Sequence, residues 1–233
     1  MEQVDVGLGL IWFLAFLFST TVHEAMHALA AWRLGDSTAY QGGQVTLNPL
    51  PHVTREPIGM VLLPLLTSLT QGWAIGWASC PYDPIWARRH PGRAAVMAAA
   101  GPLGNLLIAI VAFIAIRAGV ALGWFVAPAH VNFDSMIEMA AGGTTFVTTL
   151  LSVFLVMNVF LCVFNLLPLP PLDGSAILEG ILPERHAVKL QELQSHSLMS
   201  MLGLVIAWRV FPLISDPIFT LLLRVVHPFD SYS

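Results

Sequence analysis

The chain has 233 residues, of which 56% are hydrophobic and only 10% are charged. Soluble domains carry about a quarter charged residues to cover their surface, so this composition excludes an ordinary water-soluble protein and favours a bilayer. Ten Lys and Arg residues, spread over a chain of net charge −4, do not make a nucleic-acid-binding surface. The two cysteines provide neither a disulfide framework nor a paired metal motif.

Apolar stretches run nearly from one end of the chain to the other and predict a single integral-membrane domain over residues 1–233. We expect an all-α polytopic membrane protein with five to six membrane segments. The domain begins with a helix at 6–32, followed by a β-like and re-entrant region at 35–93. Two core helices at 94–118 and 144–174 come next, and C-terminal helices occupy 175–228.

The region after the first helix contains a β-like run at 44–47, which ends at Asn48-Pro49 and predicts a short hairpin. The next apolar segment, 58–78, is uncharged but is interrupted by Pro64, Gly72 and Gly76. If this segment enters the bilayer and returns, the basic residues of the loops can all lie on one side. We therefore prefer a re-entrant segment, with basic loops in the cytoplasm and the N-terminus outside.

The sharpest feature of the first helix is the run His23-Glu24-Ala25-Met26-His27. Residues four apart share one face of a helix, so the two imidazoles can bind the same metal ion. Glu24 is then close enough to take a proton from a water molecule at that metal. The alternative is a pair of interfacial histidines with a snorkelling glutamate, but these groups are costly within an apolar segment unless they have a use. The run therefore favours a metal site.

A catalytic zinc site needs a third protein ligand and one open position. Asp173 is the best candidate, because it ends the run Asn165–Asp173, in which three prolines in four positions interrupt the fourth apolar segment. Irregular backbone at membrane depth is tolerated where it lines a cavity. Asp173 also suits the N-cap of a helix from Gly174 to about Ile181, and the two roles are compatible.

These motifs resemble those of the site-2 protease family of intramembrane metalloproteases. That family combines a membrane-embedded HExxH with a downstream N-x-x-P-x-P-x-L-D-G motif, and the runs His23–His27 and Asn165–Gly174 match both. The run Gly101–Asn105 also fits the G-P-x-x-N motif on the helix between them. The resemblance covers about residues 14–182.

The resemblance implies one Zn²⁺ ion with three protein ligands, namely His23, His27 and Asp173. It also implies that Glu24 is the general base and that Asn165 positions the substrate or stabilises the oxyanion. For Asn105 it implies a structural or substrate-orienting role.

The connection after the first helix resembles a compact bacterial branch of this family, with Leu34-Gly35-Asp36 directly after the zinc helix. That branch usually has Gly-Trp-Ala-Lys-Pro after the second segment, whereas this chain has the run Gly76-Trp77-Ala78-Ser79-Cys80-Pro81. No role of the missing lysine is therefore carried over. The chain also leaves no room for the PDZ or CBS domains of larger relatives.

The function implied is an intramembrane zinc endopeptidase of a bacterial inner membrane, with its active site nearer the cytoplasmic face. Its partners would be a transmembrane protein or peptide substrate and the lipid bilayer. The oligomeric state, including a homo-oligomer, stays open. A substrate helix must unwind before its carbonyls can react, and the β-like run Gln44–Asn48 is expected to hold it by strand addition.

Two other functions remain to be weighed. A metal-ion transporter would place His and acidic residues on several helices along a path, whereas here they gather in one helical turn and one Asp motif. A catalytically silent relative that only binds membrane proteins would be free to lose Glu24, which this chain retains.

Overall fold

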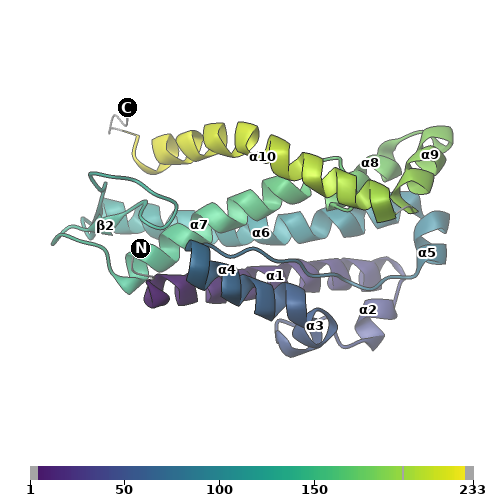
Figure 1. Cartoon of the computed structure of the whole chain (residues 1–233), viewed down its shortest axis with the longest axis horizontal. Coiled ribbons are helices and arrows are strands. Elements are labelled where there is room, and N and C mark those ends of the chain that lie inside the picture. The colour runs from purple at the N-terminus through teal and green to yellow at the C-terminus, as the bar shows by residue number, and fades with distance from the viewer. Residues whose placement is uncertain (1–4, 196, 229–233) are drawn as a thin grey trace.

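The computed structural model describes residues 5–195 and 197–228 and is mostly helical (Figure 1). Within these residues, four helices are long and apolar enough to cross a membrane: α1, α6, α7 and α10, at Val6–Leu34, Pro91–Ala121, Phe146–Asn165 and Ser197–Val226. The shorter helices are α2, α3, α4, α5, α8 and α9, at Thr38–Gln41, Leu50–Arg55, Leu63–Gln71, Pro84–Arg89, Asp173–Ile181 and Glu184–Ser195. The predicted all-α polytopic fold is therefore confirmed.

Three of the long helices, α1, α6 and α7, pack against one another and form the centre of the molecule (Figure 1). Local sequence signals fix where they begin and end. The Asp5 side chain accepts a hydrogen bond from the Leu8 N–H at 3.0 Å and so caps the start of α1. Gly35, at φ 109°, ends α1 in the left-handed conformation that glycine adopts most easily. Thr145 and Thr148 form a capping box at the start of α7.

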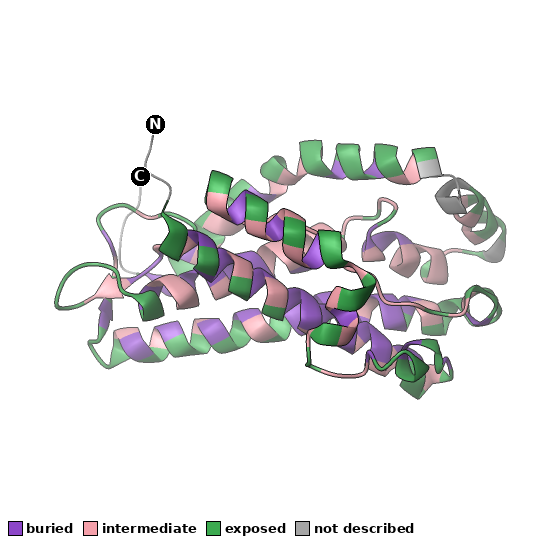
Figure 2. Ribbon diagram, turned by 60° about the horizontal axis from the view of Figure 1, so that its bottom comes forward, coloured by how far each residue is buried: buried purple, intermediate pink, exposed green. Residues whose placement is uncertain are grey.

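Large apolar side chains cover the outward faces of the long helices. On α6 the exposed ones include Leu103, Leu107, Ile110, Val111 and Ile114. Figure 2 shows such exposed residues, in green, along helices whose inward faces are buried. An apolar surface of this extent suits contact with lipid tails and would be unfavourable in water. The chain is an integral membrane protein.

The segment after α3 enters the helical layer and returns. A π-helical turn at Ile58–Leu62 leads directly into α4, and together they form a short apolar helix at Ile58–Gln71. A helix of this length rises about 21 Å, which is less than a bilayer core of about 30 Å. Residues 72–83 then run back without regular structure to α5, as Figure 1 shows. This is the geometry predicted for a re-entrant segment, and it brings the candidate membrane segments to five.

Two predictions of local structure were wrong. The run at 44–47 forms no strand, and the region after α1 contains α2 and α3 instead of a hairpin. Among the described residues, strands pair only in the connection between α6 and α7, where β1 (Phe125–Val126) is antiparallel to β2 (Glu138–Met139). The fourth apolar segment does not stay helical to residue 174, because α7 ends at Asn165 and residues 166–172 form turns.

Candidate metal centre

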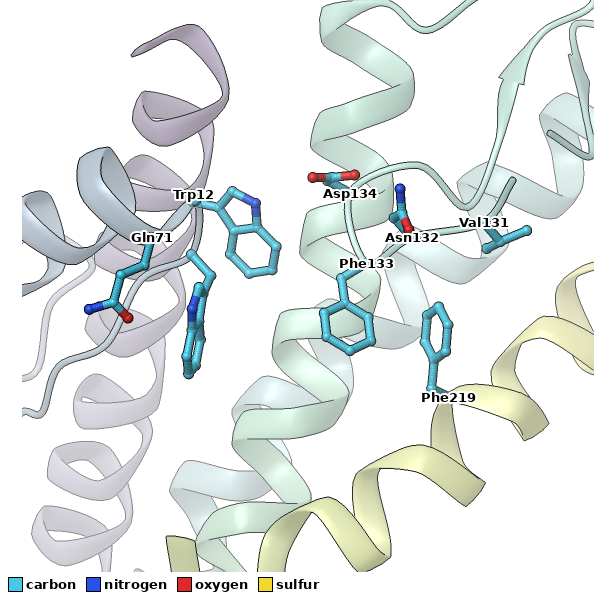
Figure 3. A pocket seen from close by; sticks show the side chains of 9 residues that line it. Trp12, Gln71, Val131, Asn132, Phe133, Asp134 and Phe219 are labelled. Atoms are coloured by element: carbon cyan, nitrogen blue, oxygen red, sulfur yellow. The ribbon is translucent and has the colours of Figure 1, made fainter. Parts of the chain in front are cut away.

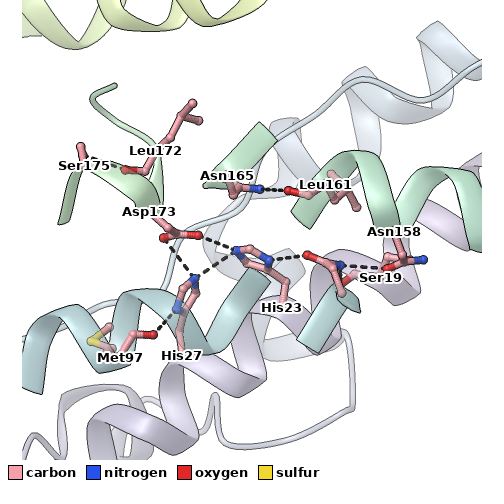
Figure 4. A network of polar contacts seen from close by, with 11 residues as sticks. Ser19, His23, His27, Met97, Asn158, Leu161, Asn165, Leu172, Asp173 and Ser175 are labelled. Carbon is pink, nitrogen blue, oxygen red and sulfur yellow. Dashed lines mark hydrogen bonds and ion pairs between the residues drawn. The ribbon is translucent and has the colours of Figure 1, made fainter. Parts of the chain in front are cut away.

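Three side chains converge at the contact between α1 and the start of α8 (Figure 4). The Nε2 atoms of His23 and His27 lie 3.0 Å apart. Asp173 Oδ2 lies 3.1 Å from His23 Nε2, and Asp173 Oδ1 lies 3.3 Å from His27 Nε2. Among the described residues, this is the group of three or more His, Cys, Asp and Glu side chains close enough together to hold one metal ion.

The two histidines lie on one face of α1 because they are four residues apart, whereas Asp173 arrives from a distant part of the chain. The turns at 166–172 end α7 and direct α8 back toward α1, so that Asp173 is the first residue of α8. Leu172 occupies the N-cap position, and its side chain makes no capping hydrogen bond. The alternative role of Asp173 as an N-cap is therefore wrong. Gly174 permits this turn, because a Cβ atom there would collide with the carbonyl oxygens of Leu166 and Leu167.

A second hydrogen bond fixes the orientation of each imidazole. His27 Nδ1 lies 2.8 Å from the carbonyl oxygen of Met97, and because a carbonyl only accepts, this nitrogen carries the proton. His23 Nδ1 lies 2.6 Å from Asn105 Oδ1 and donates in the same way. Both Nε2 atoms are then left with lone pairs that face each other and a carboxylate.

This set of donor atoms fits a divalent cation. Two imidazole lone pairs and a carboxylate at about 3 Å repel one another unless a positive charge lies among them. Histidine nitrogens and a carboxylate oxygen are ligands that zinc takes in catalytic sites, with the other ring nitrogen hydrogen-bonded as it is here. The neighbouring helix leaves the space open, since a Cβ atom on Gly101 of α6 would lie 2.6 Å from His23 Nε2 and closer still to His27 Nε2.

Glu24 lies between the two histidines in the sequence and is only 5% exposed. Its Oε2 atom is buried and has no hydrogen-bond partner among the described residues. A buried carboxylate oxygen that lacks a partner is costly, and such atoms call for an explanation. Beside a metal site, the atom is available to accept a proton from a bound molecule.

The remaining candidates lie outside the cluster of His23, His27 and Asp173. Asn165 is half-buried at the end of α7, and its Nδ2 donates to the Leu161 carbonyl at 2.9 Å (Figure 4). His52 of α3 is buried and places Nε2 at 3.1 Å from the Thr46 carbonyl oxygen. Neither belongs to the metal-binding group.

Sequence reasoning missed part of the site. The motif implied a structural or substrate-orienting role for Asn105, and its contact with His23 is of the structural kind, but the partner itself was not predicted. The contributions of Gly101 and of the Met97 carbonyl were not foreseen either, because both depend on how α6 packs against α1. An asparagine within an apolar membrane helix is costly unless it has a hydrogen-bond partner. This cost is the feature of the sequence from which a buried partner for Asn105 could have been predicted.

A separate cavity of about 440 Å³ lies toward the opposite end of α1 (Figure 3). Aromatic side chains form much of its wall, together with one carboxylate, from Trp12, Trp73, Phe133, Phe219 and Asp134. Trp12 precedes His23 by eleven residues on the same helix, which corresponds to about 16 Å along its axis. The cavity is therefore distinct from the metal centre.

Comparison with known proteins agrees with this site. The model of peptidase family M50 matches residues 11–210. A Bacillus subtilis protein named "Putative zinc metalloprotease YwhC" is 31% identical over 83% of this chain and 78% of its own length. Proteins named "Putative zinc metalloprotease Rip2" are 32% identical in Mycolicibacterium smegmatis and 29% in Mycobacterium tuberculosis strain H37Rv.

The alignments with the two Rip2 proteins cover 75% and 82% of this chain, but only 58% and 65% of the relatives' own lengths. No solved structure matches the chain. The family match covers most of the chain, including His23, His27 and Asp173. The chain therefore belongs to peptidase family M50, the family of the site-2 proteases that its motifs resemble.

Proposed function

We propose that this protein is a zinc endopeptidase that hydrolyses peptide bonds within or near the transmembrane segments of other membrane proteins. The observation that carries the proposal is the buried, unpartnered Oε2 of Glu24 beside the converging His23, His27 and Asp173. Membership of family M50 and the names of the relatives support a zinc metalloprotease. The position of the cluster among membrane-crossing helices supports cleavage inside the bilayer.

His23, His27 and Asp173 would hold the zinc ion, and the ion would polarise a substrate carbonyl and make a water molecule more acidic. Glu24 takes the proton of the attacking water on Oε2 and can return it to the amine that leaves. The hydrogen bonds from the two Nδ1 atoms keep both imidazoles oriented throughout this exchange.

Asn165 is proposed to stabilise the negative charge that develops on the substrate carbonyl oxygen. One N–H of its amide is used by the Leu161 carbonyl, which holds the side chain in place at the end of α7. The other N–H has no partner among the described residues and can donate to a bound substrate. Asn165→Ala should therefore slow cleavage by about 10²–10³ and leave zinc affinity unchanged.

The segment that holds an unwound substrate was predicted at 44–48, but this run is not extended. We now assign that role to residues 74–81 of the returning segment. The N–H groups of Ile75 and Trp77 bond to Thr67 and Gly59, so this edge of the segment faces the re-entrant helix. The N–H of Ala78 has no partner among the described residues and is free to pair with an extended peptide.

This segment passes near the metal centre, because Cys80 packs against the buried cluster of Ala31, Trp86 and Met97, and the Met97 carbonyl bonds to His27. Ala78→Pro would remove the free N–H, and it should slow cleavage about tenfold while zinc stays bound. Ala78→Val is the matched control because it keeps the N–H, and equal cleavage by the two variants would contradict the assignment.

The membrane orientation belongs to the same proposal. Basic residues gather at the end of the molecule that contains α5, α9 and the C-terminal end of α1: Arg33, Arg88, Arg89, Arg93, Arg185 and Lys189. Loops with such an excess face the cytoplasm. The metal centre, at the level of His23 and His27, is nearer to this end of α1 than to its start. Water would then reach it from the cytoplasmic side of a bacterial inner membrane.

The decisive experiment compares the wild type with Glu24→Gln in detergent, using a reporter with one transmembrane helix and measuring bound zinc in each sample. We expect equal zinc contents and a loss of cleavage of about 10²–10⁴ in Glu24→Gln. A chelator should also stop cleavage by the wild type. Equal cleavage by both proteins would contradict the role of Glu24. Zinc binding without cleavage of any transmembrane reporter by the wild type would favour the silent relative.

A further inference from the structure

Two asparagines lie buried in the apolar centre of the bundle, between the three long helices. Asn105 on α6 and Asn158 on α7 are both 0% exposed. Asn105 Nδ2 lies 2.9 Å from Asn158 Oδ1, and Asn158 Nδ2 lies 2.9 Å from Ser19 Oγ on α1 (Figure 4). This chain of amides ends on the ring of His23.

The direction of each hydrogen bond follows from groups that can only accept. Asn158 Nδ2 lies 2.9 Å from the carbonyl oxygen of Phe154, so this end of the side chain must be the amino group. Asn158 therefore presents its oxygen to Asn105. The amino group of Asn105 must face that oxygen, and it also lies 3.3 Å from the carbonyl oxygen of Ser19.

The oxygen of Asn105 is then the atom that faces His23 Nδ1 at 2.6 Å, and it can only accept. His23 must carry its proton on Nδ1, which leaves Nε2 as a free ligand atom. If the amide of Asn105 were reversed, its amino group would face Nδ1 and would favour the proton on Nε2. That tautomer cannot bind a metal ion through Nε2.

The two histidines differ in how firmly this proton is placed. The partner of His27 is the Met97 carbonyl in the backbone of α6, which cannot rotate. The partner of His23 is a side-chain amide, which can rotate by half a turn. Reversal would bring Asn105 Oδ1 against Asn158 Oδ1 and against the Ser19 carbonyl, where acceptors would face acceptors in a buried site.

We infer that Asn158 is a positioning residue: by orienting the amide of Asn105, it fixes the tautomer of His23 in which Nε2 binds the metal. This inference rests on the proposed zinc site. The hydrogen bonds of Asn158 go to Asn105, Ser19 and Phe154, so it reaches His23 through Asn105. A neutral aspartic acid keeps the acceptor oxygen that faces Asn105 and one of the two donor bonds of Asn158, so Asn158→Asp should preserve the function, whereas Asn158→Leu should not.

The test measures Zn²⁺ affinity of the full-length protein by competition with a chelator. Asn105→Leu should weaken binding by about 10–100-fold, and Asn158→Leu by about tenfold. The double variant should be no weaker than Asn105→Leu, because Asn158 has no effect once Asn105 is absent. Asn158→Asp should stay within about threefold of the wild type. Additive losses in the double variant would overturn the inference.

A second readout separates this role from general loss of packing. In zinc-loaded protein, the Nδ1 proton of His23 should exchange with solvent faster in Asn158→Leu, while that of His27 keeps its wild-type rate. Ser152→Ala is the matched control: Ser152 is also buried on α7, and it bonds to Met136 N–H and to the Thr148 carbonyl, away from His23. If Ser152→Ala or the His27 proton changed equally, the inference would be wrong.

Failure of the proposed function has a different signature. A wild-type protein that binds no Zn²⁺ would contradict the zinc site itself, whatever the asparagine variants do. A wild-type protein that binds Zn²⁺ with an affinity unchanged in Asn158→Leu would contradict only the role of Asn158.

Discussion

The two ends of α1 differ in how their ring nitrogens are held. Around His23 and His27, each ring nitrogen has a partner: Nδ1 of His27 faces the Met97 carbonyl, and Nδ1 of His23 faces Asn105, which Asn158 holds in turn. Toward the start of the helix, Trp12 is 6% exposed and its Nε1 has no partner among the described residues. It borders a cavity walled mainly by aromatic side chains (Figure 3).

The difference shows which end is built for chemistry. Ligand atoms must be held in place before a substrate arrives, and this requires partners for the groups behind them. The two histidines meet this requirement through contacts with α6 and α7, whereas Trp12 Nε1 at the far end has no such partner among the described residues. One carboxylate lies near each end: Asp36, just beyond the metal end of α1, accepts hydrogen bonds from Thr38 and Asp83, and Asp134 lines the aromatic cavity.

The largest effect is expected where α6 touches the metal centre. Gly101→Ala places a methyl group 2.6 Å or less from the Nε2 atoms of His23 and His27, so the rings must move apart. We expect Zn²⁺ affinity to fall by about 100-fold or more, with loss of cleavage. The measurement is chelator competition on purified protein.

Gly92→Ala is the control for this prediction, because a Cβ atom at Gly92 of the same helix meets nothing within 4 Å. It should bind zinc like the wild type. Unchanged zinc affinity in Gly101→Ala would mean that the cluster of His23, His27 and Asp173 is not the metal site.

The candidate ligands and Gly101 differ in how far the sequence alone could reveal them. The candidate ligands His23, His27 and Asp173 were predicted from two motifs, because residue type and helical spacing are visible in the sequence. The closeness of Gly101 to both rings was not, since it depends on the packing of α6 against α1 across more than seventy residues. The tautomers of the histidines depend on equally distant contacts, from Met97 and Asn105.

The secondary structure likewise divides into elements that the sequence predicts and elements that it does not. The first helix was predicted at 6–32 and is observed at Val6–Leu34, because a long apolar run is a strong signal and Gly35 ends it. The strand predicted at 44–47 fails because a strand needs a partner, and β propensity alone supplies none. The pair that does form, β1 with β2, is only two residues long on each side and left no periodic signal.

A smaller effect is expected at Asp36, next to the metal end of α1. Its Oδ1 accepts from Thr38 N–H and Oγ1 at 2.9 and 2.6 Å, and its Oδ2 accepts from Asp83 N–H at 2.8 Å, which ties α1 to the segment before α5. Burial alone would raise the pKa of Asp36, but the hydrogen bonds from Thr38 and Asp83 outweigh it and hold the pKa below its ordinary value.

A lowered pKa means that the folded state holds the carboxylate charged more firmly than the unfolded state does. The stability from Asp36 is therefore fully present above the ordinary pKa of about 4 and is lost as the pH falls through the lower folded value. Asp36→Asn should lower the unfolding free energy at neutral pH by about 1–2 kcal/mol. The unfolding free energy of the variant should also fall less than that of the wild type as the pH is lowered. Thermal unfolding in detergent from neutral to acidic pH measures both. An equal acid loss in the variant would contradict the assignment.

The smallest effect is expected at Asp134 in the far cavity, where substitution should stabilise the protein instead of destabilising it. Burial raises its pKa above the ordinary value, the bonds from its own N–H and from Ser135 oppose this, and the nearby carboxylate of Asp5 adds to it. The folded state therefore favours the neutral acid, and the stability contributed by Asp134 grows as the pH falls through the raised folded pKa and is complete below the ordinary value of about 4. Asp134→Asn should raise the unfolding free energy at neutral pH by about 0.5 kcal/mol or less and should remove this gain. Because the cavity is remote from His23, zinc affinity should not change, and a loss of zinc binding in this variant would show that the two ends of α1 are coupled.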